Sequence, residues 1–105
     1  MDEMNEPQAS GSATASVDAD GRTIVVVSGE FDVSNADVLR KALDDTESSQ
    51  PVVIDARELR FVDSSGLAVL LQCAERTGPI EIRDAPPVLH RIVEISGLAD
   101  VLRLV

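Results

Sequence analysis

The chain has 105 residues, with 19 acidic against 9 basic residues and a net charge of −10. This length fits one domain with a single apolar core. The acidic balance and the presence of only two aromatic residues argue against direct binding to DNA or RNA, and one cysteine with one histidine cannot build a disulfide within the chain or a structural zinc site.

The amino-terminal segment, residues 1–13, is polar and acidic and contains scarcely any large apolar side chain. Such a composition cannot offset the entropy lost on ordering, so we predict a disordered tail, followed by one folded domain over residues 14–105. The segment lacks the basic and apolar parts of a signal peptide, and no apolar run reaches the length of a membrane span. We therefore expect a cytoplasmic protein with no membrane insertion and no cofactor.

The first folded elements form a predicted hairpin. Two β-rich runs flank the pair Asp20-Gly21, which is typical of a tight two-residue turn. We predict strands over residues 14–19 and 22–28.

A helix and a central strand are predicted next. The run "SNADVLRKALDDTE" offers Ser34 or Asn35 as the capping residue and repeats its apolar residues at helical spacing, which predicts a helix over 35–46. The run "PVVIDA" is short, apolar and β-branched, as in a strand covered on both faces. A polar connection, "RELRFV", is expected to follow it.

The second predicted helix begins within "DSSGLAVLLQCAERT" and ends before Gly78 and Pro79. We interpret Cys73 as a small residue of this helix. Four of its apolar residues have the spacing of one helical face, which we expect to pack on the core: Leu67, Leu70, Leu71 and Ala74.

The remaining sequence predicts a strand in "PIEIRDA", a helix in "PPVLHRIVEISG" and a last turn and strand in "ADVLRLV". A hairpin followed by alternating helices and strands indicates an α/β domain. We expect a mixed β-sheet of four to five strands with helices packed on it.

The motif "DSSG" places three polar residues at the start of the second helix. Asp63 can cap the helix by accepting backbone N–H bonds, which leaves Ser64 and Ser65 in the first turn with at least one hydroxyl exposed. A phosphate on such a serine could be held by the positive helix end and its unpaired backbone donors. Taken alone, the motif is more typical of ordinary first-turn serines.

The wider sequence resembles the STAS domains of bacterial anti-sigma factor antagonists. The resemblance rests on "VSGEFDVSNADVLRKAL", "VVIDA", "LRFVDSSGLAVLL" and "VLHRIVEISGLADVLRL", from Val17 to Leu104. It implies that Ser64 is phosphorylated by a partner that is both a serine kinase and an anti-sigma factor. It also implies that the unphosphorylated form binds this partner and releases the sigma factor, so that transcription proceeds, and it leaves room for a serine phosphatase as a further partner.

The same resemblance implies that the loop after the second strand, containing Glu30 and Asp32, approaches the serine loop and touches the partner. Asp32 is the better contact candidate, because it matches the acid of the family. Ser65 is expected to be structural, since two phosphates in one helical turn would repel. Two explanations remain open for Gly66. The absence of a side chain could let the partner approach closely, or it could let the helix pack closely. The candidate partner-binding residues are Asp32, Glu30, Asp63, Ser65, Gly66 and Leu67.

Two other functions compete with this hypothesis. A STAS scaffold subunit of a transporter ATPase or a stress-signalling complex would bind through the second helix without a phosphate cycle. An enzyme is disfavoured, because His90 with Asp63 and Ser64 lacks a nucleophile elbow and oxyanion glycines, and His90 is expected at the surface. Many family members carry a further helix after the last strand, so we expect one sheet face here to be less well covered.

Overall fold

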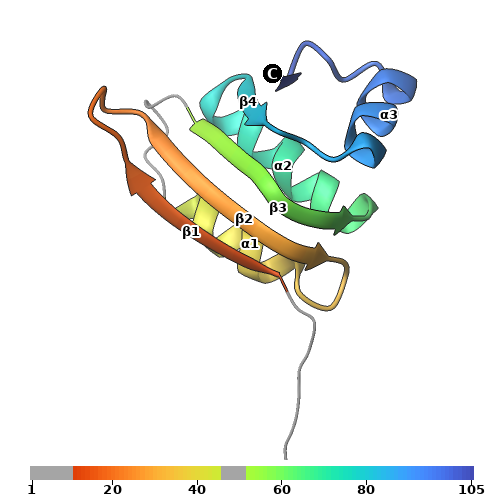
Figure 1. Ribbon diagram of the computed structural model, residues 1–105, viewed down its shortest axis with the longest axis horizontal. Coiled ribbons are helices and arrows are strands. Elements are labelled where there is room, and N and C mark those ends of the chain that lie inside the picture. Colours follow the sequence, from red (N-terminus) through yellow and green to blue (C-terminus); the bar gives the residue numbers. More distant parts are fainter. Residues whose placement is uncertain (1–10, 46–51) are drawn as a thin grey trace, which may run out of the picture.

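The computed structural model describes residues 11–45 and 52–105, which form one five-stranded sheet with three helices (Figure 1). The strands stand in the spatial order β1-β2-β3-β4-β5. The first pair is antiparallel and the other pairs are parallel. This arrangement confirms the predicted mixed α/β domain. In chain order the elements are β1 (Ser12–Val17), β2 (Thr23–Phe31), α1 (Ala36–Asp44), β3 (Val52–Val62), α2 (Ser64–Thr77), β4 (Ile80–Arg83), α3 (Pro87–Ser96) and β5 (Leu102–Leu104).

Several strand boundaries differ from the prediction, including the end of β1 at Val17 and the start of β2 at Thr23. β1 begins at Ser12, inside the segment predicted to be a tail, while residues 1–10 lie outside the described part of the chain. β2 continues to Phe31. β3 runs through "RELRFV", which was predicted to be a polar connection. The pairing of β2 with β3 shifts register twice, so the charged residues of this stretch stay within a bulged strand.

The predicted hairpin is present, but its turn spans residues 18–22 and is longer than the two-residue turn predicted at Asp20-Gly21. The Gly21 N–H donates to the Asp18 carbonyl oxygen at 3.0 Å, and Gly21 has a φ of +84° that glycine adopts without strain. Helix α1 spans fewer residues than the predicted 35–46, of which residue 46 lies outside the described part of the chain.

One apolar core lies on the helix side of the sheet. Alternate residues of β2, Thr23, Val25 and Val27, are buried, as expected of a strand with one covered face. Helices α1 and α2 pack on this side, and buried residues of α3 join the same cluster. The buried face of α2 is shifted from the predicted one, since Gly66 and Val69 are buried, whereas Leu67 and Leu71 are only partly buried. The buried residues of α2 are Gly66, Val69, Leu70, Cys73 and Ala74.

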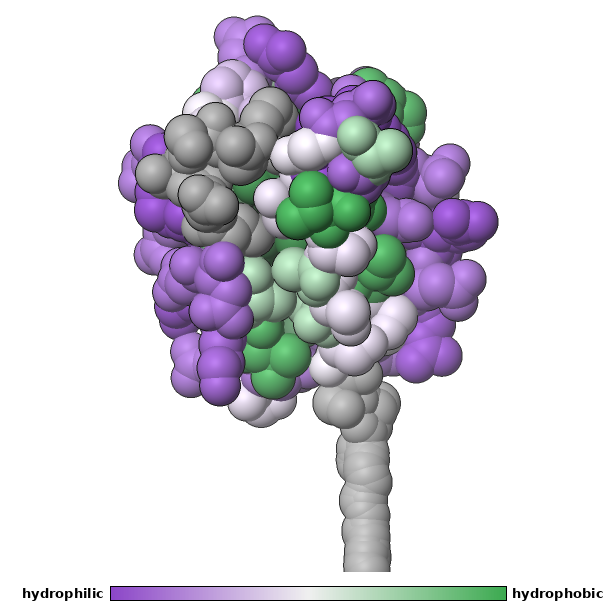
Figure 2. Space-filling view, turned by 90° about the vertical axis from the view of Figure 1, so that its left-hand side faces the viewer, coloured by the Kyte–Doolittle hydropathy of each residue, from purple (hydrophilic) through white to green (hydrophobic). Residues whose placement is uncertain are grey.

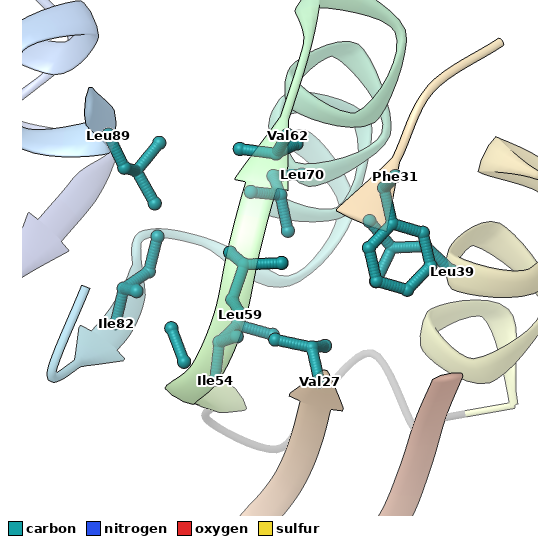
Figure 3. Close-up of a pocket in the computed structure, with 10 residues that line it drawn as sticks. Val27, Phe31, Leu39, Ile54, Leu59, Val62, Leu70, Ile82 and Leu89 are labelled. Carbon is teal, nitrogen blue, oxygen red and sulfur yellow. The ribbon is translucent and has the colours of Figure 1, made fainter. Parts of the chain in front are cut away.

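The core leaves almost no empty space. The cavity drawn in Figure 3 has a volume of about 10 Å³, close to that of a single water-sized probe. Ten apolar residues from all three helices and three of the strands line it, and none of them offers a polar side chain. A small-molecule ligand therefore does not fit there.

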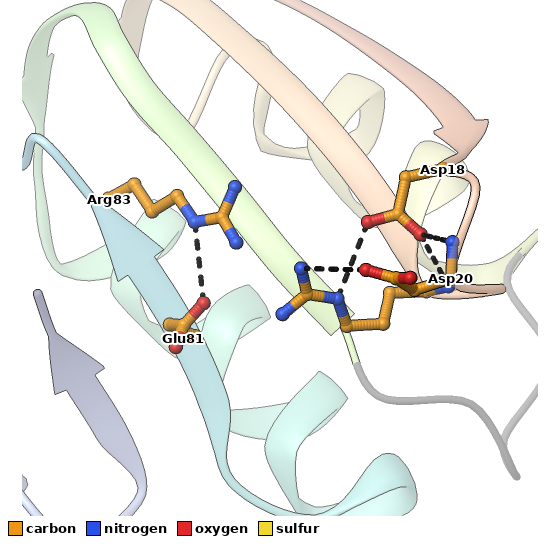
Figure 4. Close-up of polar contacts among 5 residues, drawn as sticks. Asp18, Asp20, Glu81 and Arg83 are labelled. Carbon is orange, nitrogen blue, oxygen red and sulfur yellow. Dashed lines mark hydrogen bonds and ion pairs between the residues drawn. The ribbon is translucent and has the colours of Figure 1, made fainter.

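The opposite face of the sheet carries charged side chains beside a few apolar ones, among them Val53, which is buried. Glu81 pairs with Arg83 at 3.3 Å, and Arg22 pairs with Asp18 at 3.3 Å and with Asp20 at 3.8 Å (Figure 4). An apolar residue of this face, Val26, is 41% exposed. Water can solvate the charged side chains of this face.

Candidate functional site

The site is built on the adjacent carboxyl ends of two parallel strands. Phe31, the last residue of β2, lies opposite Val62, the last residue of β3. The Asp63 N–H then donates to the Phe31 carbonyl oxygen at 3.1 Å, which extends the pairing by one residue. The loop that begins at Asp32 and the start of α2 are therefore held side by side, as the resemblance implied.

Asp63 caps helix α2, as predicted. Its backbone is extended, with φ −99° and ψ −169°. Its carboxylate Oδ1 accepts from the Ser65 N–H at 2.8 Å and from the Gly66 N–H at 3.3 Å. Its carbonyl oxygen accepts from the Leu67 N–H at 2.9 Å, the first bond of the helix. Ser64 is exposed as the first helical residue, whereas Ser65 is partly buried.

This cap limits how the helix start could hold a phosphate. The backbone donors of Ser65 and Gly66 are already bonded to Asp63, so they are not available to a phosphate on Ser64. Such a phosphate would also lie near the Asp63 carboxylate, and like charges repel. Its charge would therefore face outward, toward whatever contacts this surface.

The loop after β2 is ordered by its own side chains. The Asp32 carboxylate accepts from the Ser34 N–H at 2.9 Å and from the Ser34 hydroxyl at 2.5 Å. These bonds, the hydroxyl bond first, hold the pKa of Asp32 below its ordinary value, because they stabilise the ionised carboxylate. Asp32 is exposed, so it presents a permanent negative charge at neutral pH.

Asn35 has a role that the sequence did not predict. It stands at the N-cap position of α1, but its side chain accepts no helix N–H. Instead its Oδ1 accepts from the Asp32 N–H at 2.8 Å, and its Nδ2 donates to the Glu30 carbonyl oxygen at 2.8 Å. Asn35 therefore links the backbone of Glu30 to that of Asp32, the two residues of this segment that the resemblance assigns to partner contact.

Removing the Ser34 hydroxyl is expected to raise the pKa of Asp32. In Ser34→Ala the carboxylate keeps the backbone N–H bond but loses the hydroxyl bond, the largest cause of the lowered pKa. Because the folded-state pKa of Asp32 is depressed, its contribution to stability is present above the unfolded pKa and is lost as the pH falls through the folded value. An NMR titration of the Asp32 carboxyl carbon in both proteins measures the shift. An unchanged or lower pKa in Ser34→Ala would contradict this assignment of the cause.

Glu30 lies at a different place from the one predicted. It belongs to β2 rather than to the loop, and its carboxylate is 3.9 Å from the Arg60 guanidinium of β3. The pair is well exposed, so it contributes little to stability. Glu30 therefore adds less unpaired negative charge to the surface than Asp32 does.

Gly66 and Leu67 are placed by packing. A Cβ on Gly66 would lie 2.4 Å from Val62 Cγ2 and 3.3 Å from Phe31 Cβ, so α2 approaches the strand ends closely at this residue. This contact supports helix packing as a reason for glycine at position 66. Leu67 is partly buried against the core, so only part of its side chain can meet a partner.

Two exposed apolar residues near these loops were missed by the sequence analysis. Val33 follows Asp32 and is 81% exposed, and Phe61 stands two residues before Asp63 and is 44% exposed. Large apolar side chains at a charged surface are typical of protein contact sites. Their position within "GEFDV" and "RFVD", next to the candidate site residues, could have indicated them. The bulge that turns Phe61 outward, however, cannot be predicted from the order of apolar and polar residues.

The described residues show no arrangement suited to metal chemistry. Over 11–45 and 52–105, no three His, Cys, Asp or Glu side chains are grouped so that they could hold a metal ion. His90 is exposed on α3, as predicted. Cys73 is buried in α2, and burial raises the pKa of its thiol. No helix in the described part of the chain is long and apolar enough to cross a membrane.

Comparison with known proteins identifies relatives over most of the chain. The family model described as "Mlab, STAS domain" matches residues 15–105. An anti-sigma F factor antagonist of Paenibacillus polymyxa is 32% identical over 89 residues, covering 78% of this chain and 76% of that protein. The crystal structure of an anti-sigma factor antagonist from Mycobacterium paratuberculosis is 28% identical, with a TM-score of 0.75, and covers 93% of this chain and 87% of that chain. The structure of the anti-sigma factor antagonist SpoIIAA in its unphosphorylated form is 15% identical, with a TM-score of 0.64. The match covers 80% of this chain and 83% of that chain.

Proposed function

The chain belongs to the STAS-domain family of anti-sigma factor antagonists, and from this premise we propose that it binds an anti-sigma factor that is also a serine kinase. In the proposed cycle the unphosphorylated form binds the kinase and displaces the sigma factor. Phosphorylation of Ser64 ends the binding, and a serine phosphatase restores it. The protein acts in the cytoplasm as the substrate of its partner, and no catalytic role is assigned to it.

One observation carries the proposal: Ser64 is exposed at the first position of a capped helix, beside an ordered acidic loop. A kinase must reach the hydroxyl without unfolding its substrate, and the Asp63 cap fixes the backbone on which Ser64 stands. A partner with basic side chains would meet Asp32 and Asp63 on this surface. Val33 and Phe61 would supply apolar contact area at the rim.

A phosphate can act as a switch at this surface through charge alone. It adds a charge of about −1.5 to −2 at pH 7. The Ser65 and Gly66 N–H groups are bonded to the Asp63 carboxylate, so they would not compensate the added charge when a partner covers it. An unpaired charge buried at an interface costs several kcal/mol, which is enough to dissociate a complex of moderate affinity.

Mapping the modified residue tests the proposal. We expect incubation with a purified anti-sigma factor kinase from the same genome and ATP to place one phosphate on Ser64, as located by mass spectrometry of peptides. Ser64→Ala should accept none, and Ser65→Ala should still be modified because its cap donor is a backbone N–H. Phosphate that persists in Ser64→Ala would overturn the assignment. Capture of a transporter ATPase in place of a kinase would favour the alternative function, a scaffold without a phosphate cycle.

A further inference from the structure

The two edges of the sheet are protected to different degrees. Exposed edge strands usually carry charges, proline or a bulge, or are very short, because an open edge can pair with another chain. The β5 edge has three residues with an exposed Arg103 in the middle. The β1 edge, "SATASV", has six residues without charge or proline, and its pairing with β2 is continuous. No other described strand pairs with its outer side.

The hydrogen-bond pattern shows which backbone groups of β1 point outward. The Asp18 N–H donates to the carbonyl oxygen of Arg22, its cross-strand partner, at 2.9 Å. Bonded and non-bonded pairs alternate along an antiparallel ladder, so the even-numbered residues of β1 bond to β2. The N–H and C=O groups of Ala13, Ala15 and Val17 therefore face the open edge.

The sequence of this edge reads the same in both directions around Thr14, Ser-Ala-Thr-Ala-Ser. We propose that two copies of the chain pair through antiparallel β1 strands, with Thr14 of one copy opposite Thr14 of the other. In this register Ala13 faces Ala15 of the partner, and these are the residues whose backbone groups point outward. A twofold interface needs a self-complementary surface, which this strand provides.

Side chains on the helix side of the edge extend the contact. Ala13, Ala15 and Val17 point to the same side of the sheet as the core residues of β2, and Val17 is 69% exposed. Val38 of α1 is 45% exposed. Figure 2 looks onto the β1 edge, the left-hand side of Figure 1, and shows apolar and nearly neutral side chains along the middle, between hydrophilic flanks. Pairing two copies would bring two such strips together.

The net charge of the chain sets the conditions for association. Two copies, each with a charge of −10, repel at long range, and salt screens this repulsion. The contact is a strand pair with modest side-chain area, so it belongs to the small, weak class of interfaces. We expect a dimer that forms at high protein concentration and is strengthened by salt.

Cysteine cross-linking of the full chain tests the register. Thr14 would lie in a non-bonded pair, where the Cα atoms are about 4.5 Å apart, which suits a disulfide. Under mild oxidation Thr14→Cys should form a covalent dimer at least about tenfold faster than Ser16→Cys, because the two Ser16 residues would lie about 13 Å apart along the strands. A mixture of Ser12→Cys and Ser16→Cys should give the mixed dimer. The native Cys73 is buried, so the unsubstituted chain is the blank.

Sedimentation of the unmodified chain tests the association itself. We expect the average mass to rise toward that of a dimer as the concentration approaches about 1 mM, the range of a weak contact. Thr14→Lys would place two like charges opposite each other and should leave only monomer, whereas Thr14→Val should still dimerise. Circular dichroism should show that both variants fold, since Thr14 is exposed. A chain that stays monomeric at 1 mM, or Thr14→Cys that cross-links no faster than Ser16→Cys, would overturn the proposal.

Discussion

Ser64→Asp is expected to weaken binding to an anti-sigma factor by about a hundredfold, equivalent to about 2.7 kcal/mol, with little change in the melting temperature. The added carboxylate would lie at the centre of the proposed contact, next to Asp63, and burying it there without a counter-charge is unfavourable. Ser64 itself is exposed and its side chain supports no packing, so the fold should tolerate the change. Calorimetric titration and thermal unfolding measure the two quantities on the same samples.

A matched control separates local from general charge effects. Ser16→Asp adds the same charge on an exposed residue of β1, opposite Ile24 and far along the sheet from the end of β2. It should change the affinity by no more than about twofold at physiological salt, where charges beyond about 8 Å are screened. Equal losses for both variants would show that the overall charge, and not the Ser64 surface, decides binding.

The phosphate ester itself should make the effect depend on pH. Its second pKa is about 6, so the dianion predominates above pH 6 and the monoanion below it. The phosphorylated protein should therefore bind its partner more weakly at pH 7.5 than at pH 5.5. Ser64→Asp should show no such difference over this range, because a carboxylate stays ionised throughout.

Gly66→Ala is expected to destabilise the domain by about 1–3 kcal/mol, the usual effect of forcing a methyl group into a filled core. The sign of the effect is informative, because alanine within an unobstructed helix would stabilise it by about 1 kcal/mol over glycine. Here the new Cβ would lie 2.4 Å from Val62 Cγ2, and Val62 is itself buried at the end of β3. Urea unfolding of both proteins gives the difference in free energy.

A second substitution identifies the obstructing atoms. Val62→Ala removes the methyl groups that the new Cβ would meet, so Gly66→Ala should cost less in that background than in the native one. The double-mutant cycle should give a coupling of at least 0.5 kcal/mol, as for residues in direct contact. Strictly additive losses, or a gain in stability from Gly66→Ala alone, would contradict the packing explanation.

The sequence predicted the fold where local chemistry is decisive. The Asp63 cap and the glycines after α2 and α3 each act within a few residues, and the structure confirms them. The end of β3 was missed because "RELRFV" is charged, and its pairing with β2 depends on bulges between strands that are distant in sequence. No local pattern encodes such a register shift.

The candidate site could be predicted only in part. The motif and the resemblance indicated Ser64 and Asp32, but the side-chain bonds of Asn35 to both sides of the loop depend on how β2 ends. The buried face of α2 was misplaced by one position for a similar reason. Gly66 has no side chain to contribute to the apolar pattern, although it is the residue that lets the helix approach the strands.

The Asp63 cap has a consequence for how long a signal would persist. Because its carboxylate already bonds to the Ser65 and Gly66 N–H groups, a phosphate ester on Ser64 would find little stabilisation within its own chain. These two N–H groups would therefore not hold the phosphate against a phosphatase. The lifetime of the phosphorylated form would then be set by the relative amounts of the kinase and the phosphatase.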